Sequence, residues 1–352
     1  MLTLFRFSAR RRYLAVALAV TLIGAACGGN SDEGAGDGPV VVATTGIWAD
    51  VVANVACDGL VEVVTIIPAG GDPHAFEPSL ADRGAMDDSD LVVANGLGLE
   101  EGLADTIDAS EATGTAVFEM ADHVDSIPTF FDSHDDDHSD SDDHDGDGHG
   151  SDHSDDDDHG SDHGDDDDHG DEHDHEGDDP HIWFDPVRVA GALDDLGDAV
   201  VGAAGLDADA VAACVADYRA ELEAVDAEIA AMVADLPESR RKLVTSHDSM
   251  GYFADRYGFT VVGTVIPAPS TLAQSSPAQL EDLAATIEST AVPAIFAEAQ
   301  HSAADVEALA SRVGDVTVVT LNTGSLGEPG SGADTYIGFL RTNAGAVTTA
   351  LG

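Results

Sequence analysis

The sequence predicts an α/β protein with two βαβ lobes, each built on a small parallel sheet, joined by one long rigid helix. Short runs rich in β-branched residues alternate with amphipathic helical stretches in both halves of the chain, as in βαβ units. Between the halves, residues 208–234 keep an apolar side chain at every third or fourth position, the pattern of one packed helix. A chain of 352 residues is long enough for two domains with a core each.

The N-terminus predicts an export signal over residues 1–26. Four arginines precede an apolar run over residues 13–26, which is too short to span a bilayer permanently. Cys27 stands where a bacterial lipoprotein is cleaved and lipidated, although Gly24 occupies a position where leucine is usual, so simple secretion is the alternative. Residues 27–38 are rich in Gly, Ser and acids, which predicts a flexible tether.

Residues 39–205 are predicted to form the N-terminal lobe. Short buried runs indicate its parallel strands, and the stretches between them have helical patterns. The expected strands are Val40–Thr44, Val61–Ile67, Leu91–Asn95 and Thr115–Phe118, and the expected helices are Trp48–Ala56, Glu100–Ala109 and Val187–Val201.

Residues 206–236 are predicted to form the connecting helix. Its regular part, Ala208–Ala234, would be roughly 40 Å long, and Pro237 prevents it from continuing. A helix of this length suits a strut between two lobes.

Residues 237–352 are predicted to form the C-terminal lobe. The expected strands are Leu243–Ser246, Thr260–Ile266, Ala294–Ala297 and Thr317–Leu321, and the expected helices are Pro277–Glu288, Ala303–Arg312 and Thr335–Ala350. Because open α/β sheets bind ligands beyond the carboxyl ends of their strands, we expect a site in the cleft between the lobes.

The composition excludes two classes of protein. The chain has 69 acidic and 13 basic residues, a formal charge of −56, and its one lysine is Lys242. A nucleic-acid-binding protein needs a basic face, so this class is excluded. The apolar fraction of 43% is too high for a wholly disordered chain, and the acidic excess indicates a solvated surface.

Two cysteines remain if Cys27 carries a lipid. In the oxidising compartment that an export signal implies, Cys57 and Cys214 can form one disulfide. The alternative is a pair of buried free thiols.

An acidic, histidine-rich segment over residues 132–179 interrupts the N-terminal lobe. It has no basic residue and almost nothing to bury, so it predicts a disordered loop with many weak sites for divalent metals. It either gathers zinc or senses its abundance, or its metal binding is incidental to a solvated insert. Its ten histidines are His134, His138, His144, His149, His153, His159, His163, His169, His173 and His175.

Three of the five histidines outside this segment are candidate metal ligands. His74 and His181 each follow an Asp-Pro dipeptide and precede an aromatic residue, an acid and a proline. This frame supplies carboxylates that can hold the second ring nitrogen. His247 directly follows the first expected strand of the C-terminal lobe. Three imidazoles from two lobes suit a borderline-soft ion, Zn²⁺ above all. His123 has no such sequence frame and is interpreted as a surface residue.

Several stretches together match the motifs of one family. They are the acidic insert and the motifs Ile67–Pro78, Asp179–Pro186, Thr245–Phe253, Ile295–Glu298 and Gly330–Tyr336. Through them the chain resembles the metal-binding solute-binding proteins of ABC importers for zinc and manganese, of the high-affinity zinc-uptake type. The resemblance covers nearly all of the mature chain and implies two α/β lobes bridged by a long helix.

The resemblance also implies the ligands. The three metal-binding positions of the family fall on His74, His181 and His247, and a histidine at the third favours Zn²⁺ over Mn²⁺. Many members supply a fourth ligand as aspartate where this chain has Gly324. Glu298 is therefore the first candidate for the fourth position, followed by water and then by His301.

The function implied is that of an extracytoplasmic zinc-capture protein without enzymatic activity. It would be a monomer, anchored by lipid outside the cytoplasmic membrane, that passes Zn²⁺ to a membrane permease. A manganese carrier is the alternative within the family. A secreted zinc hydrolase, with an open fourth position on the metal, and a metal store dominated by the insert are the alternatives outside it.

Overall fold

The computed structural model describes residues 38–130 and 177–352. The expected export signal, Cys27, the tether up to Asp37 and the ten histidines of the insert lie outside the described residues. Residues 177–179, which we expected to belong to the disordered insert, are described: Pro128 and Asp178 form an antiparallel bridge, and Asp179 is buried.

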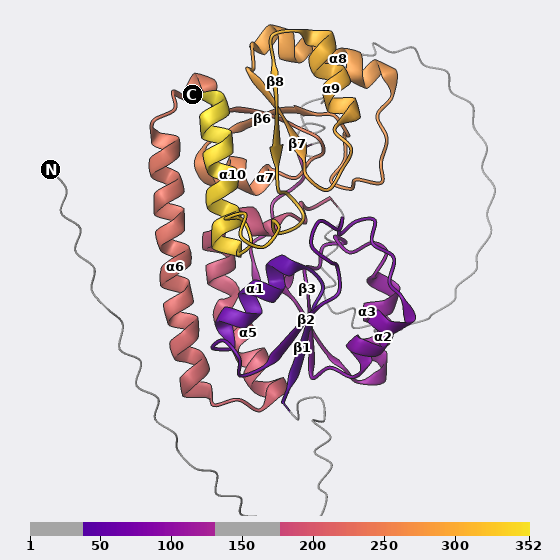
Figure 1. Ribbon diagram of the computed structural model, residues 1–352, viewed down its shortest axis with the longest axis vertical. Helices are drawn as coiled ribbons and strands as arrows, with labels where there is room; N and C mark the ends of the chain where they lie inside the picture. Colours follow the sequence, from indigo (N-terminus) through magenta and orange to yellow (C-terminus); the bar gives the residue numbers. More distant parts are fainter. Residues whose placement is uncertain (1–37, 131–176) are drawn as a thin grey trace, which may run out of the picture. The chain divides into compact units, whose positions relative to one another are not determined.

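Two four-stranded parallel sheets form the centres of the two lobes (Figure 1). In the N-terminal lobe the strand order is β2-β1-β3-β4. The strands are β1 (Val40–Ala43), β2 (Glu62–Thr65), β3 (Leu91–Ala94) and β4 (Ala116–Glu119). The strand β3 is buried along its whole length, as its run of apolar residues predicts.

The C-terminal lobe repeats this arrangement with the order β6-β5-β7-β8. Its strands are β5 (Lys242–Thr245), β6 (Thr260–Thr264), β7 (Ala294–Glu298) and β8 (Thr317–Leu321). The predicted α/β class with two small parallel sheets is thus confirmed, and every expected strand lies within two residues of its observed bounds.

The strand orders explain where a ligand can bind. In each sheet the first strand lies between the second and the third, so the connections leave it in opposite directions and open a crevice at its carboxyl end. The loops that follow β2 and β5 enter this region from different lobes.

Helices cover both sheets. Those of the N-terminal half are α1 (Gly46–Val55), α2 (Leu80–Asp87), α3 (Ala104–Thr113) and α5 (Pro186–Ala204). Those of the C-terminal half are α7 (Gly251–Tyr257), α8 (Pro277–Thr290), α9 (Ala304–Val313) and α10 (Tyr336–Leu351). Short 3₁₀ turns are η1 (Met120–His123), η2 (Ile182–Phe184) and η3 (Glu238–Arg240). The sequence analysis did not predict α2 or α7.

The connecting helix α6 spans Ala208–Ala234, the range its apolar spacing predicts. The Asp207 side chain caps its first turn by accepting a hydrogen bond from the Ala210 N–H. In Figure 1 the helix runs past both lobes with α10 beside it. Its apolar stripe is buried over the whole length, at Val211, Val215, Tyr218, Leu222, Val225, Ile229 and Val233.

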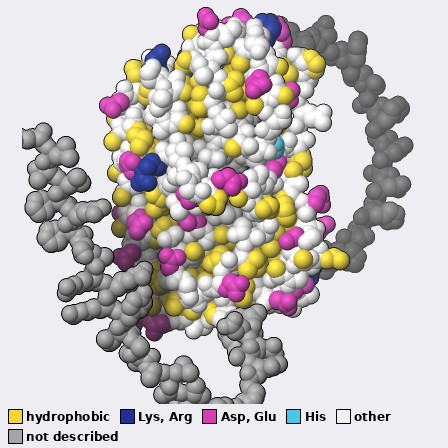
Figure 2. Space-filling model, in the orientation of Figure 1, with side chains coloured by type: hydrophobic (Ala, Val, Ile, Leu, Met, Phe, Trp, Pro, Cys, Tyr) yellow, Lys and Arg dark blue, Asp and Glu magenta, His cyan; other side chains and the backbone are white. Residues whose placement is uncertain are grey.

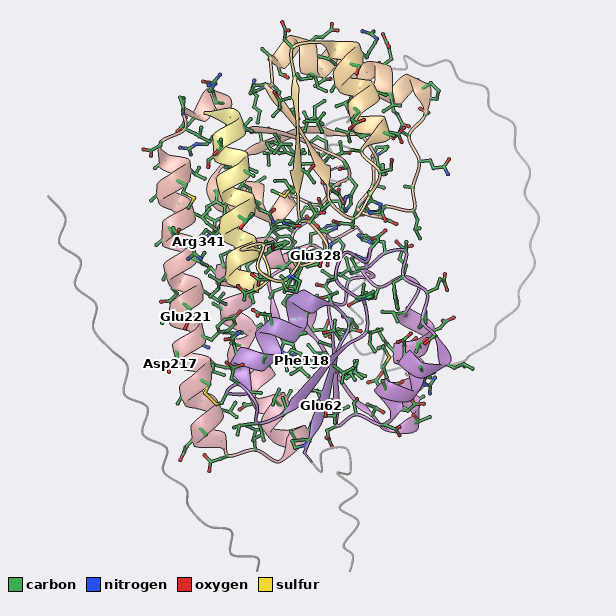
Figure 3. The ribbon with its side chains drawn as sticks, viewed as in Figure 1. Glu62, Phe118, Asp217, Glu221, Glu328 and Arg341 are labelled. Carbon is green, nitrogen blue, oxygen red and sulfur yellow. A yellow bond between two sulfur atoms is a disulfide. The ribbon has the colours of Figure 1, made fainter. Side chains whose placement is uncertain are left out.

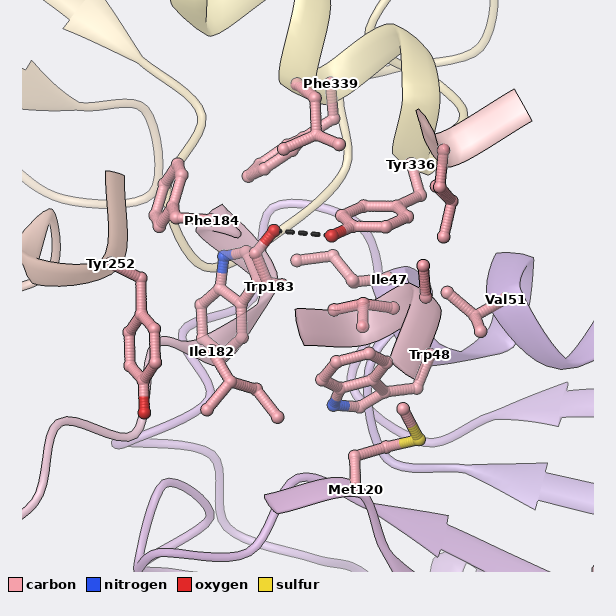
Figure 4. Packing of buried hydrophobic residues seen from close by; sticks show 14 of the residues in the cluster. Ile47, Trp48, Val51, Met120, Ile182, Trp183, Phe184, Tyr252, Tyr336 and Phe339 are labelled. Carbon is pink, nitrogen blue, oxygen red and sulfur yellow. Dashed lines mark hydrogen bonds between the residues drawn. The ribbon is translucent and has the colours of Figure 1, made fainter. Parts of the chain in front are cut away.

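Large aromatic side chains fill the space where segments of both lobes meet (Figure 4). Trp48 of α1 and Trp183 of η2 pack edge to face, with ring centroids 6.4 Å apart. The Tyr336 hydroxyl at the start of α10 donates a 2.6 Å hydrogen bond to the Trp183 carbonyl, and the Trp183 indole N–H donates to the Thr323 carbonyl. One continuous apolar core therefore runs through both lobes.

A disulfide joins Cys57, just after α1, to Cys214 of α6, with Cα atoms 5.5 Å apart. In Figure 3 it appears as a yellow bond on α6, on the side of Asp217 that is away from Glu221. The bond fixes the connecting helix to the N-terminal lobe.

The described surface is acidic. On the face shown in Figure 2, aspartate and glutamate side chains are more abundant than lysine and arginine. Several arginines form ion pairs, such as Arg341 with Glu228 and Arg256 with Asp226.

Candidate metal centre

Three histidines from separate segments converge at the junction of the lobes. His74 lies in the loop between β2 and α2, His181 immediately precedes η2, and His247 lies in the loop between β5 and α7. Nε2 of His181 lies 3.3 Å from Nε2 of His74 and 3.0 Å from Nε2 of His247. All three side chains are buried, and one ring nitrogen of each lies within 4.8 Å of the others.

Carboxylates contact two of these rings at Nδ1, the nitrogen that faces away from the cluster. Nδ1 of His181 lies 2.7 Å from Oδ1 of Asp179, and Nδ1 of His247 contacts Oε1 of Glu298. A carboxylate accepts from an imidazole N–H, so these contacts assign the ring proton to Nδ1. The lone pair on each Nε2 is thereby directed to the common centre, the arrangement by which proteins orient metal-binding histidines.

The two Asp-Pro-His frames share one feature and differ in another. In both, the aspartate accepts a hydrogen bond from the histidine backbone N–H, at 3.0 Å for Asp72 and 2.9 Å for Asp179. Asp179 also holds the His181 ring. Asp72 instead contacts the second lobe, where its Oδ2 accepts from the Thr271 hydroxyl and lies 3.2 Å from Nε2 of His301.

Burial keeps two of the three rings, those of His74 and His181, neutral. Burial, followed by the neighbouring rings of His181 and His247, holds the pKa of His74 well below its usual range. Burial and the ring of His247 do the same to the pKa of His181. At neutral pH both imidazoles are uncharged, which is the form that binds a metal.

The two supporting carboxyls differ in their charge. Burial raises the pKa of Asp179 to about 7. Burial acts in the same direction on Glu298, but the charge and hydrogen bond of His247 outweigh it and lower the pKa of Glu298 to about 2. Glu298 is therefore ionised at neutral pH.

The residues considered for the fourth position lie outside the cluster of three Nε2 atoms. Glu298 faces Nδ1 of His247, and its second oxygen accepts from the Gln300 amide at 3.3 Å. His301 lies beside Asp72. At Gly324 a Cβ atom would lie 2.9 Å from Cδ of Pro73, so this site has no room for a longer side chain.

Other residues from the sequence analysis lie apart from the cluster. His123 stacks on Phe118 and pairs with Asp195 at the surface. Asp248, the neighbour of His247, accepts a 2.8 Å hydrogen bond from the Phe130 N–H. The Asp-Pro-His frame was expected to supply a carboxylate for the second ring nitrogen, and Asp179 does so for His181, whereas Asp72 does not for His74.

A cavity of about 650 Å³ adjoins His74. Acidic side chains line it from three segments: Glu101, Glu119, Asp122 and Asp178. Thr129 and Gly177, near the two ends of the undescribed insert, also line it, and the Thr129 N–H donates a 2.9 Å hydrogen bond to the Gly177 carbonyl.

Two α/β lobes that hold converging imidazoles between them define a metal-binding solute-binding protein. Residues 41–350 match the family described as "ZnuA: Zinc-uptake complex component A periplasmic". The chain belongs to this family, whose members are the metal-binding substrate-binding components of zinc and manganese ABC importers, transport components that work with a permease and an ATPase.

The chain is similar to relatives named for manganese and to relatives named for zinc. The manganese-binding lipoprotein MntA of Halalkalibacterium halodurans is 25% identical over 340 residues, which cover 96% of this chain and 97% of that protein. The zinc-binding protein TroA of Treponema pallidum is 27% identical over 333 residues, 92% of each chain. The solved structure of the periplasmic TroA has a TM-score of 0.72 at 25% identity and covers 89% of this chain and 99% of its own.

The relatives are lipoproteins or periplasmic proteins by name. Over residues 38–130 and 177–352, no helix has both the length and the apolar character that crossing a membrane requires.

Proposed function

We propose that this protein captures Zn²⁺ between its lobes and delivers it to the permease of an ABC importer. The observation that supports zinc is the donor set: three imidazole Nε2 atoms converge, while the nearest carboxylates, Asp179 and Glu298, occupy the Nδ1 side of two rings. Nitrogen donors suit Zn²⁺, whereas Mn²⁺ prefers oxygen. The geometry at Gly324 also supports this choice, because a carboxylate side chain there would have to displace Pro73.

The zinc ion would be bound by His74, His181 and His247, with water in the fourth position. Glu298, our first candidate for that position, is better assigned as the carboxylate that orients His247. The same assignment argues against a zinc hydrolase. A general base must reach the metal-bound water, whereas Glu298 contacts Nδ1 of His247, the ring nitrogen that faces away from the metal.

The insert would supply weak auxiliary sites beside the cavity at His74. Lipid attached to Cys27 would hold the protein, as a monomer, outside the cytoplasmic membrane. Mass analysis of the membrane-bound mature chain tests the anchor, and Cys27→Ser should release the protein in soluble form.

Calorimetric titration of the metal-free mature chain tests the metal assignment. We expect one tight Zn²⁺ site in the intact chain and in a chain lacking residues 132–176, with additional weak sites only in the intact chain. Mn²⁺ should bind the shortened chain more weakly than Zn²⁺. Tighter binding of Mn²⁺ would make the protein a manganese carrier, and loss of all tight binding with the insert would make it a metal store.

Replacing His247 by alanine locates the tight site. His247→Ala should weaken Zn²⁺ binding by orders of magnitude, whereas the surface variant His123→Ala should bind as the wild type does. Unchanged affinity in His247→Ala would refute the three-histidine site.

A further inference from the structure

His74 differs from the other two histidines of the cluster at its second ring nitrogen. Nδ1 of His181 and Nδ1 of His247 each contact a buried carboxylate. Nδ1 of His74 is buried and has no hydrogen-bond partner among the described residues. The nearest carboxylate is that of Glu101, with Oε1 at 3.7 Å, beyond the usual hydrogen-bond range of about 2.7–3.2 Å.

The backbone around Glu101 is held firmly while its side chain is not. The preceding residue, Glu100, is buried and accepts hydrogen bonds from the Thr44 hydroxyl and the Asn95 N–H. The following residue, Gly102, lies so close to the Phe76 carbonyl that a Cβ atom there would be 2.3 Å from its oxygen. The Glu101 side chain itself is 40% exposed and lines the cavity beside His74. Rotation of this side chain alone can therefore close the remaining gap.

We propose that Glu101 is the positioning residue of His74 and moves into a hydrogen bond with Nδ1 when the metal binds. This inference rests on the proposed metal site. In the structure, Nδ1 of His74 makes no hydrogen bond to a described residue, and the Glu101 carboxylate stays 3.7 Å away.

Metal binding fixes the tautomer of this ring. A metal needs the Nε2 lone pair, so the proton of the neutral imidazole lies on Nδ1. This Nδ1–H faces Glu101 and can donate to it. All three imidazoles are then held by a carboxylate, from Asp179, Glu298 and Glu101 respectively.

Three variants separate a specific hydrogen bond from general attraction by negative charge. Glu101→Ala removes the carboxylate, and Glu101→Asp keeps its charge but withdraws it by one methylene. Glu119→Gln removes one charge from the same cavity without touching His74. We expect Zn²⁺ affinity, measured on the intact mature chain in chelator-buffered zinc, to fall about 10–100-fold in both Glu101 variants and to stay near wild type in Glu119→Gln.

Ring N–H resonances of the ¹⁵N-labelled chain supply a second measurement. With Zn²⁺ bound, we expect three slowly exchanging resonances in the wild type, one for each Nδ1–H held by a carboxylate, but only two in Glu101→Ala and Glu101→Asp. Wild-type affinity in both Glu101 variants, an equal loss in Glu119→Gln, or no third resonance in a wild type that binds Zn²⁺ tightly would each overturn the role of Glu101. Absence of tight Zn²⁺ binding in the wild type would instead refute the proposed function.

Discussion

At the scale of single residues, sequence spacing indicated which histidines meet but not which atom of each ring faces its neighbours. His74, His181 and His247 were found from an Asp-Pro-His frame and a position after a strand, and the structure brings them together. The placement of Glu298 could not be predicted, because both ring nitrogens of His247 are compatible with a nearby carboxylate in the sequence. Burial and rotamer decide that it meets Nδ1.

Neutralising Glu298 should weaken metal binding without removing a ligand. In Glu298→Gln the His247 ring loses a charged acceptor, so we expect Zn²⁺ affinity to fall about 10–100-fold. Isothermal titration of the variant against Glu288→Gln, a surface change of the same kind, measures the effect. A fall as large as that of His247→Ala would show instead that Glu298 is a ligand.

Placing at position 324 the aspartate that the family resemblance implies should not tighten Zn²⁺ binding. The Cβ atom of Gly324→Asp would lie 2.9 Å from Pro73 and 3.0 Å from the Gln300 amide, so the loop beside His74 must shift. We expect weaker Zn²⁺ binding and a lower melting temperature. Gly84→Asp, at a position with open space, is the control; tighter metal binding in Gly324→Asp would contradict the expectation.

At the scale of helices and strands, the quality of the prediction followed the strength of the pattern. The bounds of α6 were predicted because an apolar stripe repeats over 27 residues and a proline follows. The helix α2 was missed because it buries little besides Met86, although its capping box at Ser79 and Asp82 was visible in the sequence. The helix α7 has only 7 residues and no side-chain cap.

The buried Glu100 carboxyl accepts hydrogen bonds from the Thr44 hydroxyl after β1 and from the Asn95 N–H after β3. Its contribution to stability should depend on pH. Burial raises its pKa from 4.5 to about 7. The folded state therefore binds more protons than the unfolded chain between these values, and stability from this group is present below pH 4.5 and lost as pH rises through 7. We therefore expect the free energy of unfolding of Glu100→Gln, relative to that of the wild type, to be about 3 kcal/mol higher at pH 8 than at pH 4.

Urea unfolding of both metal-free proteins at the two pH values measures this difference. Glu62→Gln in β2, where the side chain is exposed, is the matched control. A difference between Glu100→Gln and the wild type that does not change with pH would rule out a titrating Glu100.

At the scale of the whole molecule, the two lobes are joined more extensively than the sequence indicated. One connecting helix was predicted, and α6 confirms it. The return of α10 along α6, with the Tyr336 N–H donating to the Asp50 carboxylate of α1, was not predicted. Such contacts join residues 286 positions apart and leave no local pattern in the sequence.

The disulfide should contribute to the stability of this assembly. It links residues 157 positions apart, so its removal frees a long loop in the unfolded chain. The free energy of unfolding should fall by about 2–5 kcal/mol as a result. Thermal unfolding with and without reductant measures this contribution. The variant with both Cys57→Ala and Cys214→Ala should melt lower and not respond to reductant; an unchanged melting temperature of the reduced wild type would contradict the expectation.

The hydrogen bond from the Thr129 N–H to the Gly177 carbonyl has a consequence for how this protein can evolve. The chain leaves and re-enters the fold at neighbouring backbone atoms, so the length of the intervening segment is nearly independent of the rest of the molecule. Each doubling of such a segment costs only about 0.6 kcal/mol in loop-closure entropy. Changes in the length of the segment between Thr129 and Gly177 can therefore leave the described residues around His74 in place.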